Sequence, residues 1–330
     1  MAALSSPQTG PRRRLEIFSG RGHRALAEAI ASRLGLEIGE ANLRDFPSGE
    51  IHCRFDASIR GSDVFIIQTH CPPVNQAIME QLIMIEAARR ASARRIIAVC
   101  PYYGYSRQDR KSTGREPITA KLVADLLTAA GADRVVSVDL HSGQIQGFFN
   151  FPVDHLTAMP VLLDYLRAEG PDDLVIVSPD AGRVKVAERF SQQLGTDLAF
   201  VHKRRPPGHT HEVEAMEVIG NVAGKCCVVL DDMIDTAGTI CAAADRLVEA
   251  GATDVWAMAT HPVLSPPALE RLEKSVISKV VVTDTLPLPS NGALAKIEVL
   301  SIAQIIADAI DAVYEDTSVS EIFGGQNVSP

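Results

Sequence analysis

Strand-like and helix-like patterns alternate along almost the whole sequence. Residues 63–69 and 95–100 are apolar runs of strand length, and residues 74–90 and 118–130, which follow them, have apolar residues at helical spacing. Parallel strands need crossover connections that are usually helices, so this order predicts an α/β fold with mainly parallel sheets flanked by helices. A chain of 330 residues is long enough for two such domains.

An internal duplication supports the two-domain prediction. A shift of 120 residues aligns an Ala-Gly-Ala turn at 130–132 with one at 250–252, and His141 with His261. A shift of 110 pairs DVFIIQTH (63–70) with DLVIVSPD (173–180). Chance similarity between generic α/β units is the alternative, but the paired turns and histidines weigh against it. We therefore expect two related domains, of residues 14–157 and 158–312, with residues 313–325 completing the first and residues 1–13 forming a disordered tail.

Composition and charge argue against several classes of protein. The net charge of −9 disfavours a nucleic-acid binder, which usually has a basic surface. No apolar run approaches the roughly 18 residues that a membrane span requires. The six cysteines lack CxxC or zinc-type spacing, so we expect reduced thiols in a cytoplasmic protein.

The segment VVLDDMIDTAGTI (228–240) combines the features of a ribose-phosphate site. Apolar residues lead into the paired carboxylates of Asp231 and Asp232, and a turn of small residues and a helical pattern follow. The turn consists of Asp235, Thr236, Ala237, Gly238 and Thr239. A loop that opens a helix presents N–H groups at the positive end of the helix dipole, which suits phosphate, while the carboxylates suit sugar hydroxyls or a metal. An acidic strand end followed by a capped helix is the alternative.

Polar residues also follow other predicted strands, where ligands bind in open α/β sheets. His141 and Asp180 are suitable ligands for Mg²⁺ that is otherwise held by phosphate oxygens and water. The run HKRR (202–205) concentrates positive charge of the kind that stabilises a transferring polyphosphate, with a solvated basic run as the alternative. The loop 101–117 carries Arg107, Gln108 and three tyrosines, which suits either a nucleotide or a flexible surface.

Taken together, the motifs resemble one enzyme family. They are FPSGE (46–50), YSRQDRK (105–111), REPITAKLVADLL (115–127), VDLHSGQIQGFF (138–149), SPDAG (178–182), HKRR (202–205) and DDMIDTAGT (231–239). DDMIDTAGT alone indicates only the wider phosphoribosyltransferase group. The combination resembles ribose-phosphate pyrophosphokinase of the phosphate-regulated class, also called phosphoribosyl pyrophosphate (PRPP) synthetase, over about residues 15–323.

The resemblance implies a reaction, a fold and an assembly. Enzymes of this family move the β,γ-pyrophosphoryl group of ATP to the 1-hydroxyl of ribose 5-phosphate, giving PRPP and AMP for nucleotide biosynthesis. The implied fold is two phosphoribosyltransferase-type domains. Mg²⁺ is the implied metal, and a homohexamer built from dimers, regulated allosterically by phosphate and ADP, is the implied assembly.

The resemblance also implies a role for each matching residue. Residues implied to hold ATP are Phe46, Ser48, Gly49, Glu50, Arg107 and Gln108. Residues implied to bind ribose 5-phosphate are Arg205, Asp231, Asp232, Asp235, Thr236, Ala237, Gly238 and Thr239. His141 and Asp180 would bind Mg²⁺, and Lys203 and Arg205 would stabilise the transferring group.

One residue departs from the family pattern, and two other functions are alternatives to this interpretation. Ser48 stands where several relatives have an acidic residue or asparagine, so the hydrogen bond offered to adenine would differ. A base-salvage phosphoribosyltransferase shares the DD…DTAGT element but leaves the SRQD loop without a role. A non-catalytic regulatory relative would show insertions in the HKRR loop or loss of its lysine and arginine, and neither change is present.

Overall fold

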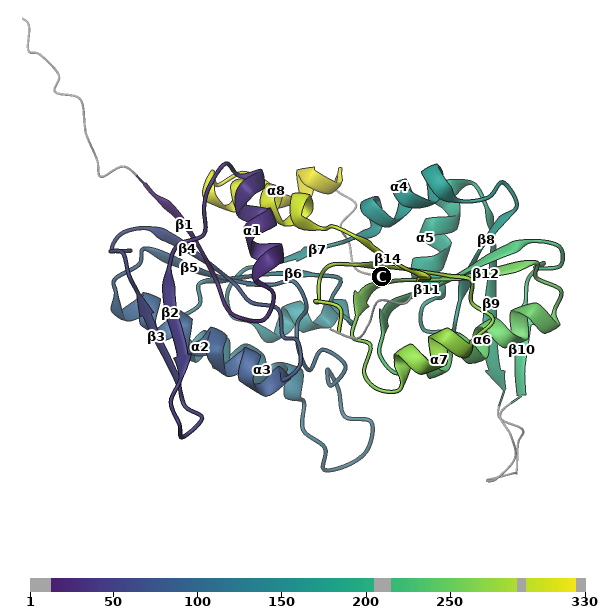
Figure 1. The fold of residues 1–330 in the computed structure, drawn as a ribbon, viewed down its shortest axis with the longest axis horizontal. Coiled ribbons are helices and arrows are strands. Elements are labelled where there is room, and N and C mark those ends of the chain that lie inside the picture. Colours follow the sequence, from purple (N-terminus) through teal and green to yellow (C-terminus); the bar gives the residue numbers. More distant parts are fainter. Residues whose placement is uncertain (1–12, 205–214, 290–294, 325–330) are drawn as a thin grey trace, which may run out of the picture.

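The structure, a computed structural model, describes residues 13–204, 215–289 and 295–324. The predicted α/β fold is confirmed, with two large sheets side by side in Figure 1. The five strands of the first sheet are all parallel and lie in the order β1-β4-β5-β6-β7. They are β1 (Leu15–Ser19), β4 (Asp63–Ile67), β5 (Arg95–Cys100), β6 (Arg134–Val138) and β7 (Val153–Leu156).

The second sheet has seven strands in the order β10-β9-β8-β11-β12-β13-β14, and only β10 is antiparallel. They are β8 (Leu174–Ser178), β9 (Asp197–Arg204), β10 (Ala215–Ile219), β11 (Cys226–Ile234), β12 (Asp254–Pro262), β13 (Lys279–Thr283) and β14 (Ile297–Leu300). The chain runs from β8 outward to β9 and then returns to β11 on the other side of β8. This reversal of direction is a topological switch point, where α/β sheets bind their ligands.

Helices cover both faces of the sheets (Figure 1). One layer contains α1 (Arg24–Arg33), α4 (Met159–Glu169), α5 (Val184–Leu194) and α8 (Ala303–Tyr314), and the other contains α2 (Val74–Arg90), α3 (Thr119–Ala130), α6 (Gly238–Glu249) and α7 (Ala268–Lys274). Two short 3₁₀ helices, η1 (Gly143–Phe148) and η2 (Val319–Phe323), complete the elements. Burial on both faces explains why β4 and β8 are mostly apolar, with a polar residue only at one end of each strand. Among the described residues, no helix combines the length and apolar character that a membrane span needs.

The two halves share one hydrophobic core. On the side of α1 and α8, buried residues form a single cluster that runs from Ile30 in α1 through Ile306 in α8 to Phe190 in α5. On the opposite side each half has a separate core. Because burying one such side chain contributes about 1.5–3 kcal/mol, the shared core fixes the halves against each other.

The end of the chain returns to the first half. Helix α8 packs against α1, and Asp316 just beyond it pairs with Arg13 at 2.9 Å and with Arg95 at 2.7 Å. The fully buried Asp63 accepts from the same two arginines and from Arg94, each at 2.8 Å. These ion pairs accord with the prediction that residues 313–325 complete the first domain. The domain boundaries stay predictions, and residues 1–12 of the expected tail lie outside the described residues.

The duplicated segments occupy matching places in the two sheets. β4 lies beside β1, and β8 lies beside β9. β6 follows α3, and β12 follows α6, which are the two helices that the 120-residue shift aligns. The neighbouring strands β1 and β9 differ in their order along the chain, because β1 precedes β4 whereas β9 follows β8. The first sheet therefore runs in one direction without a switch point.

Several elements differ from the sequence-based expectation. The carboxylates Asp231 and Asp232 do not follow the strand but belong to it, because β11 continues to Ile234 by pairing with β12. β9 continues through Arg204 and pairs with β10, in a segment expected to be an irregular loop. The strands β7 and β14 and the helix α4 were not predicted. The two strands have four residues each, and α4 has proline in its first turn, which resembles a loop in sequence.

Candidate active site

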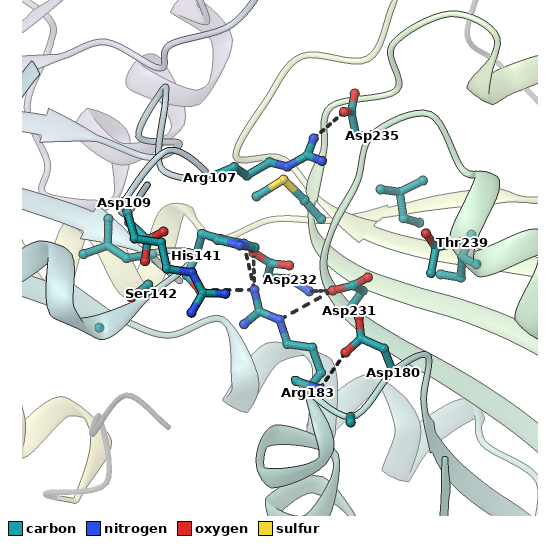
Figure 2. Close-up of a pocket in the computed structure, with 18 of the residues that line it drawn as sticks. Arg107, Asp109, His141, Ser142, Asp180, Arg183, Asp231, Asp232, Asp235 and Thr239 are labelled. Carbon is teal, nitrogen blue, oxygen red and sulfur yellow. Dashed lines mark hydrogen bonds and ion pairs between the residues drawn. The ribbon is translucent and has the colours of Figure 1, made fainter. Parts of the chain in front are cut away.

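A cavity of about 920 Å³ lies between the two halves. Its walls come from the ends of β6, β8 and β11 and from the loop after β5, as Figure 2 shows. The predicted residues that line it are Arg107, His141, Asp180, Asp231, Asp232, Asp235, Thr236, Ala237, Gly238 and Thr239. Asp180 follows β8, and the paired carboxylates lie near the end of β11, so these residues flank the switch point.

Paired carboxylates form the centre of the cavity. Asp232 Oδ2 lies 2.7 Å from Nδ1 of His141 and 2.6 Å from Nη2 of Arg183. Asp231 Oδ1 accepts the backbone N–H of Asp232 at 2.8 Å and lies 3.7 Å from Nε of Arg183. The same guanidinium contacts Nδ1 of His141 at 2.9 Å. One cation thus joins the histidine of the first half to both carboxylates of the second.

The pKa values of the two carboxylates are shifted in opposite directions. Burial, and after it the negative charge of Asp232, raise the pKa of Asp231. Burial also pushes the pKa of Asp232 upward, but the hydrogen bond with His141 and the charge of Arg183 outweigh it, so that this pKa is lowered. Two adjacent buried carboxyls do not ionise equally, and the one in contact with the cation keeps the negative charge.

The turn after β11 has the geometry of an anion site. Ala237 precedes α6 in the left-handed conformation, with φ of 60°, and is buried. Arg271 fixes the turn from α7 by donating to the carbonyl of Thr236 at 3.0 Å. Arg107 from the first half reaches Asp235 at 2.5 Å (Figure 2). The turn is therefore held in place from both halves, with the first N–H groups of a 12-residue helix behind it.

The turn that carries His141 is held by buried hydrogen bonds to the second half. Asp139 has a positive φ of 36°, and its Oδ2 accepts from the hydroxyl of Thr260 at 2.7 Å and from the N–H of Ala158 at 2.9 Å. Nε2 of His261 lies 3.0 Å from the carbonyl oxygen of Asp139. A non-glycine residue in this conformation is uncommon and persists where neighbours hold it. These contacts determine where the imidazole of His141 lies.

His141 and Asp180 fit a divalent cation that arrives with phosphate oxygens. Within the described part of the chain, Nε2 of His141 has no hydrogen-bond partner, because both contacts of the ring use Nδ1. Asp180 is half-buried and uses Oδ1 to accept the N–H of Gly182 at 2.8 Å. Among the described residues no group of three or more His, Cys, Asp or Glu side chains could hold a metal ion. One imidazole and one carboxylate match Mg²⁺, which commonly keeps several non-protein oxygen ligands.

The remaining predicted residues do not line the cavity. Gln108 turns toward α3 and accepts from the hydroxyl of Thr119 at 2.5 Å. Phe46, Ser48, Gly49 and Glu50 lie at the tip of the hairpin of β2 (Ala41–Asp45) and β3 (Ile51–Phe55), on the side of the first half away from the second (Figure 1). The side chain of Lys203 and the whole of Arg205 lie outside the described residues.

The loop after β5 is anchored by a buried histidine. His70 is fully buried, its Nδ1 accepts the N–H of Gly104 at 2.9 Å, and its Nε2 lies 2.8 Å from Oε1 of Gln81. The ring is therefore neutral, with its proton on Nε2. Burial lowers the pKa of His70 to about 4, although the bond to Gln81 partly offsets this.

This environment predicts a loss of stability in acid. Between pH 6.5, the ordinary pKa, and about pH 4, the unfolded chain binds a proton at His70 and the folded chain does not. The free energy of unfolding should therefore fall as the pH falls through this window, by about 3 kcal/mol for this group. Urea unfolding of the wild type and of His70→Gln at several pH values measures the difference. Parallel pH profiles for the two proteins would contradict the prediction.

Comparison with known proteins identifies the family. A family model of the N-terminal domain of ribose phosphate pyrophosphokinase matches residues 15–131, and a model of the phosphoribosyl synthetase-associated domain matches residues 202–324. A ribose-phosphate pyrophosphokinase of Streptomyces avermitilis is 53% identical over 324 residues, which cover 98% of this chain and 100% of that protein. The chain belongs to the ribose-phosphate pyrophosphokinase family.

Two further members of the family are similar to this chain over almost its whole length. A ribose-phosphate pyrophosphokinase of Bifidobacterium longum is 54% identical over 317 residues, covering 95% of this chain and 93% of that protein. The crystal structure of phosphoribosylpyrophosphate synthetase from Mycobacterium smegmatis superposes with a TM-score of 0.88 at 50% identity, covering 92% of this chain and 100% of that chain. The predicted family, fold class and enzyme function are thereby confirmed over the regulatory and base-salvage alternatives.

One residue at the centre of this ribose-phosphate pyrophosphokinase site was missed in the sequence. Arg183 stands three residues after Asp180, directly before α5, and its guanidinium contacts both carboxylates and His141. The available signal was a basic residue in a strand-end loop that also carries an acidic one. Only the fold shows that this loop and the end of β11 lie on either side of one switch point.

Proposed function

We propose that this cavity transfers the β,γ-pyrophosphoryl group of ATP to the 1-hydroxyl of ribose 5-phosphate, giving PRPP and AMP. The observation that carries the proposal is that one cavity brings the turn of residues 235–239, here called the phosphate turn, and the paired carboxylates together with His141 and Asp180. Relatives over the full chain are named for this activity. We further propose a cytoplasmic location, which accords with six free cysteines.

Ribose 5-phosphate would bind along the segment from β11 to α6. Asp235, Thr236, Ala237, Gly238 and Thr239 would hold the 5-phosphate on backbone N–H groups and hydroxyls. Asp231 and Asp232 would accept hydrogen bonds from the ring hydroxyls. This arrangement keeps the anionic phosphate at the helix N-terminus and away from the carboxylates, and it points the 1-hydroxyl into the cavity.

The conformation of Ala237 predicts a specific effect on ribose 5-phosphate binding. A β-branched side chain is strongly disfavoured at its φ of 60°, so Ala237→Val should distort the turn at a cost of about 1–3 kcal/mol. We expect the KM for ribose 5-phosphate to rise about tenfold in steady-state assays, a factor that corresponds to about 1.4 kcal/mol. Ala237→Gly, which suits a positive φ, is the matched control and should keep KM within about twofold. An unchanged KM in Ala237→Val would refute this role for the turn.

Mg²⁺ would be held by His141 and Asp180 together with the phosphates of ATP. When bound, the ion neutralises charge on the phosphate oxygens. The chain's own task is positioning: Asp139, Thr260 and His261 fix the turn of His141, and Gly182 orients the carboxylate of Asp180.

Cationic side chains would surround the transferring group. We assign Lys203 and Arg205 to its stabilisation, and Arg205 also to ribose 5-phosphate. Arg107 and Gln108 would contact ATP from the loop after β5. Arg107, which also lines the cavity, is already within 2.5 Å of the phosphate turn, at Asp235.

The hairpin tip, with Phe46, Ser48, Gly49 and Glu50, would contribute to ATP binding from outside its own cavity. Phe46 is 42% exposed there, so its ring is available for a contact with another molecule. A tip on the far side of the first half can reach a cavity only in another copy of the chain. This accords with the proposed homohexamer built from dimers, regulated by phosphate and ADP.

The fate of labelled phosphate tests the proposed reaction. With ATP labelled at the β-phosphate, we expect the label in the sugar product and none in ADP, because the two terminal phosphates leave together. With ATP labelled at the α-phosphate, the label should remain in AMP. Transfer of the γ-phosphate alone would leave the β label in ADP and would replace this proposal with an ordinary sugar kinase.

A further inference from the structure

Arg183 lies between the part of the cavity that carries His141 and the part that carries Asp231 and Asp232. It directly precedes α5, and its side chain is 15% exposed. Figure 2 shows the guanidinium between His141 on one side and the carboxylates of Asp231 and Asp232 on the other. No other arginine or lysine among the described residues pairs with these two carboxylates.

The contacts of Arg183 use groups that the proposed function needs for ligands. Nη2 lies 2.6 Å from Oδ2 of Asp232, 2.9 Å from Nδ1 of His141 and 3.2 Å from the carbonyl of His141. Nε lies 3.7 Å from Oδ1 of Asp231. A lone pair that accepts from the guanidinium is not available to a sugar hydroxyl, and the fixed charge repels a divalent cation beside His141.

We propose that Arg183 is an internal counter-ion that competes with the divalent metal and the sugar for this site. In the conformation described here it balances the buried carboxylates. Loading the site requires the guanidinium to leave Asp232 and to move its charge away from His141. Arginine suits this role because it stays charged at every physiological pH and because its planar fork reaches several acceptors at once. The inference rests on the proposed function for the location of the ligands, but not for the reaction.

Metal affinity without turnover tests this role. Mn²⁺ binding to the nucleotide-free protein, followed by the electron paramagnetic resonance of free Mn²⁺, should be about tenfold tighter in Arg183→Gln than in the wild type. Arg183→Lys retains the charge and should stay within about threefold of the wild type. A residue with a merely structural role would weaken binding when removed, so the direction of the change separates the two roles. Thermal unfolding of each variant verifies that the fold is kept.

A matched control separates the effect of the Arg183 contacts from the effect of removing one positive charge from the cavity. Lys185 lines the same cavity but forms no ion pair with Asp231 or Asp232, so Lys185→Gln should tighten Mn²⁺ binding by less than about twofold. Equal or weaker binding to Arg183→Gln, or no measurable binding to either protein, would overturn the proposal. Formation of AMP by the wild type is assayed separately, so that a failure of the proposed reaction is not mistaken for a failure of this inference.

Discussion

Replacing Lys203 with alanine should lower kcat by about 10²-fold or more while the protein remains folded. Pyrophosphoryl transfer needs little covalent chemistry from the protein and depends on positioning and on cations that stabilise the charge of the transferring group. The backbone of Lys203 is in β9, where it is opposite Met216 of β10. Its loss therefore removes a charge needed in the transition state more than one needed to bind either substrate.

Steady-state kinetics with both substrates separates these effects. We expect the KM values to change less than kcat, and Lys203→Arg to recover part of the rate. Lys274→Ala is a suitable control, since Lys274 is 72% exposed on α7 and, among the described residues, forms an ion pair only with Glu270 on the same helix. Near-normal turnover of Lys203→Ala would reject the assignment of Lys203.

Replacing Asp232 with asparagine should lower kcat/KM for ribose 5-phosphate by about 10²-fold or more. The side chain of Asp232 is 6% exposed, and its ionised Oδ2 contacts both Arg183 and His141. Hydrogen bonds to a charged group contribute about 1.5–3 kcal/mol each, and the substitution weakens several at once. Asparagine keeps the shape but cannot balance Arg183.

Ribose 5-phosphate binding by isothermal titration calorimetry, together with kinetics, measures this effect. Asp245→Asn makes the same change at an exposed position of α6 and should leave kcat/KM unaltered. If Asp232→Asn bound and turned over ribose 5-phosphate like the wild type, the carboxylate pair would not be part of the sugar site.

Much of the architecture could be predicted from the sequence because the relevant signals are local. Apolar runs with β-branched residues predicted β5 with the same bounds and β4 to within two residues, and helical spacing predicted α2 and α3 to within one residue. The phosphate turn was also local, since a small-residue turn between a strand and a helix is one short segment. Its residues line the cavity as expected.

What could not be predicted depends on the order of strands in the sheet. Asp231 and Asp232 look like a loop in sequence, yet pairing with β12 keeps them in the strand. The role of Arg183 depends on β8 and β11 being neighbours, which periodicity does not reveal. Strand order also explains why only the second half has a phosphate turn at a switch point, since the first sheet runs in one direction and has no reversal.

The most direct test of the account is the release of AMP from ATP by the purified protein, with ribose 5-phosphate and Mg²⁺ each present or absent. The cavity described here requires all three to act together. We therefore predict that AMP and PRPP form in equal amounts, and only when ribose 5-phosphate and Mg²⁺ are both added. AMP formed without ribose 5-phosphate, or no AMP with both present, would contradict the account.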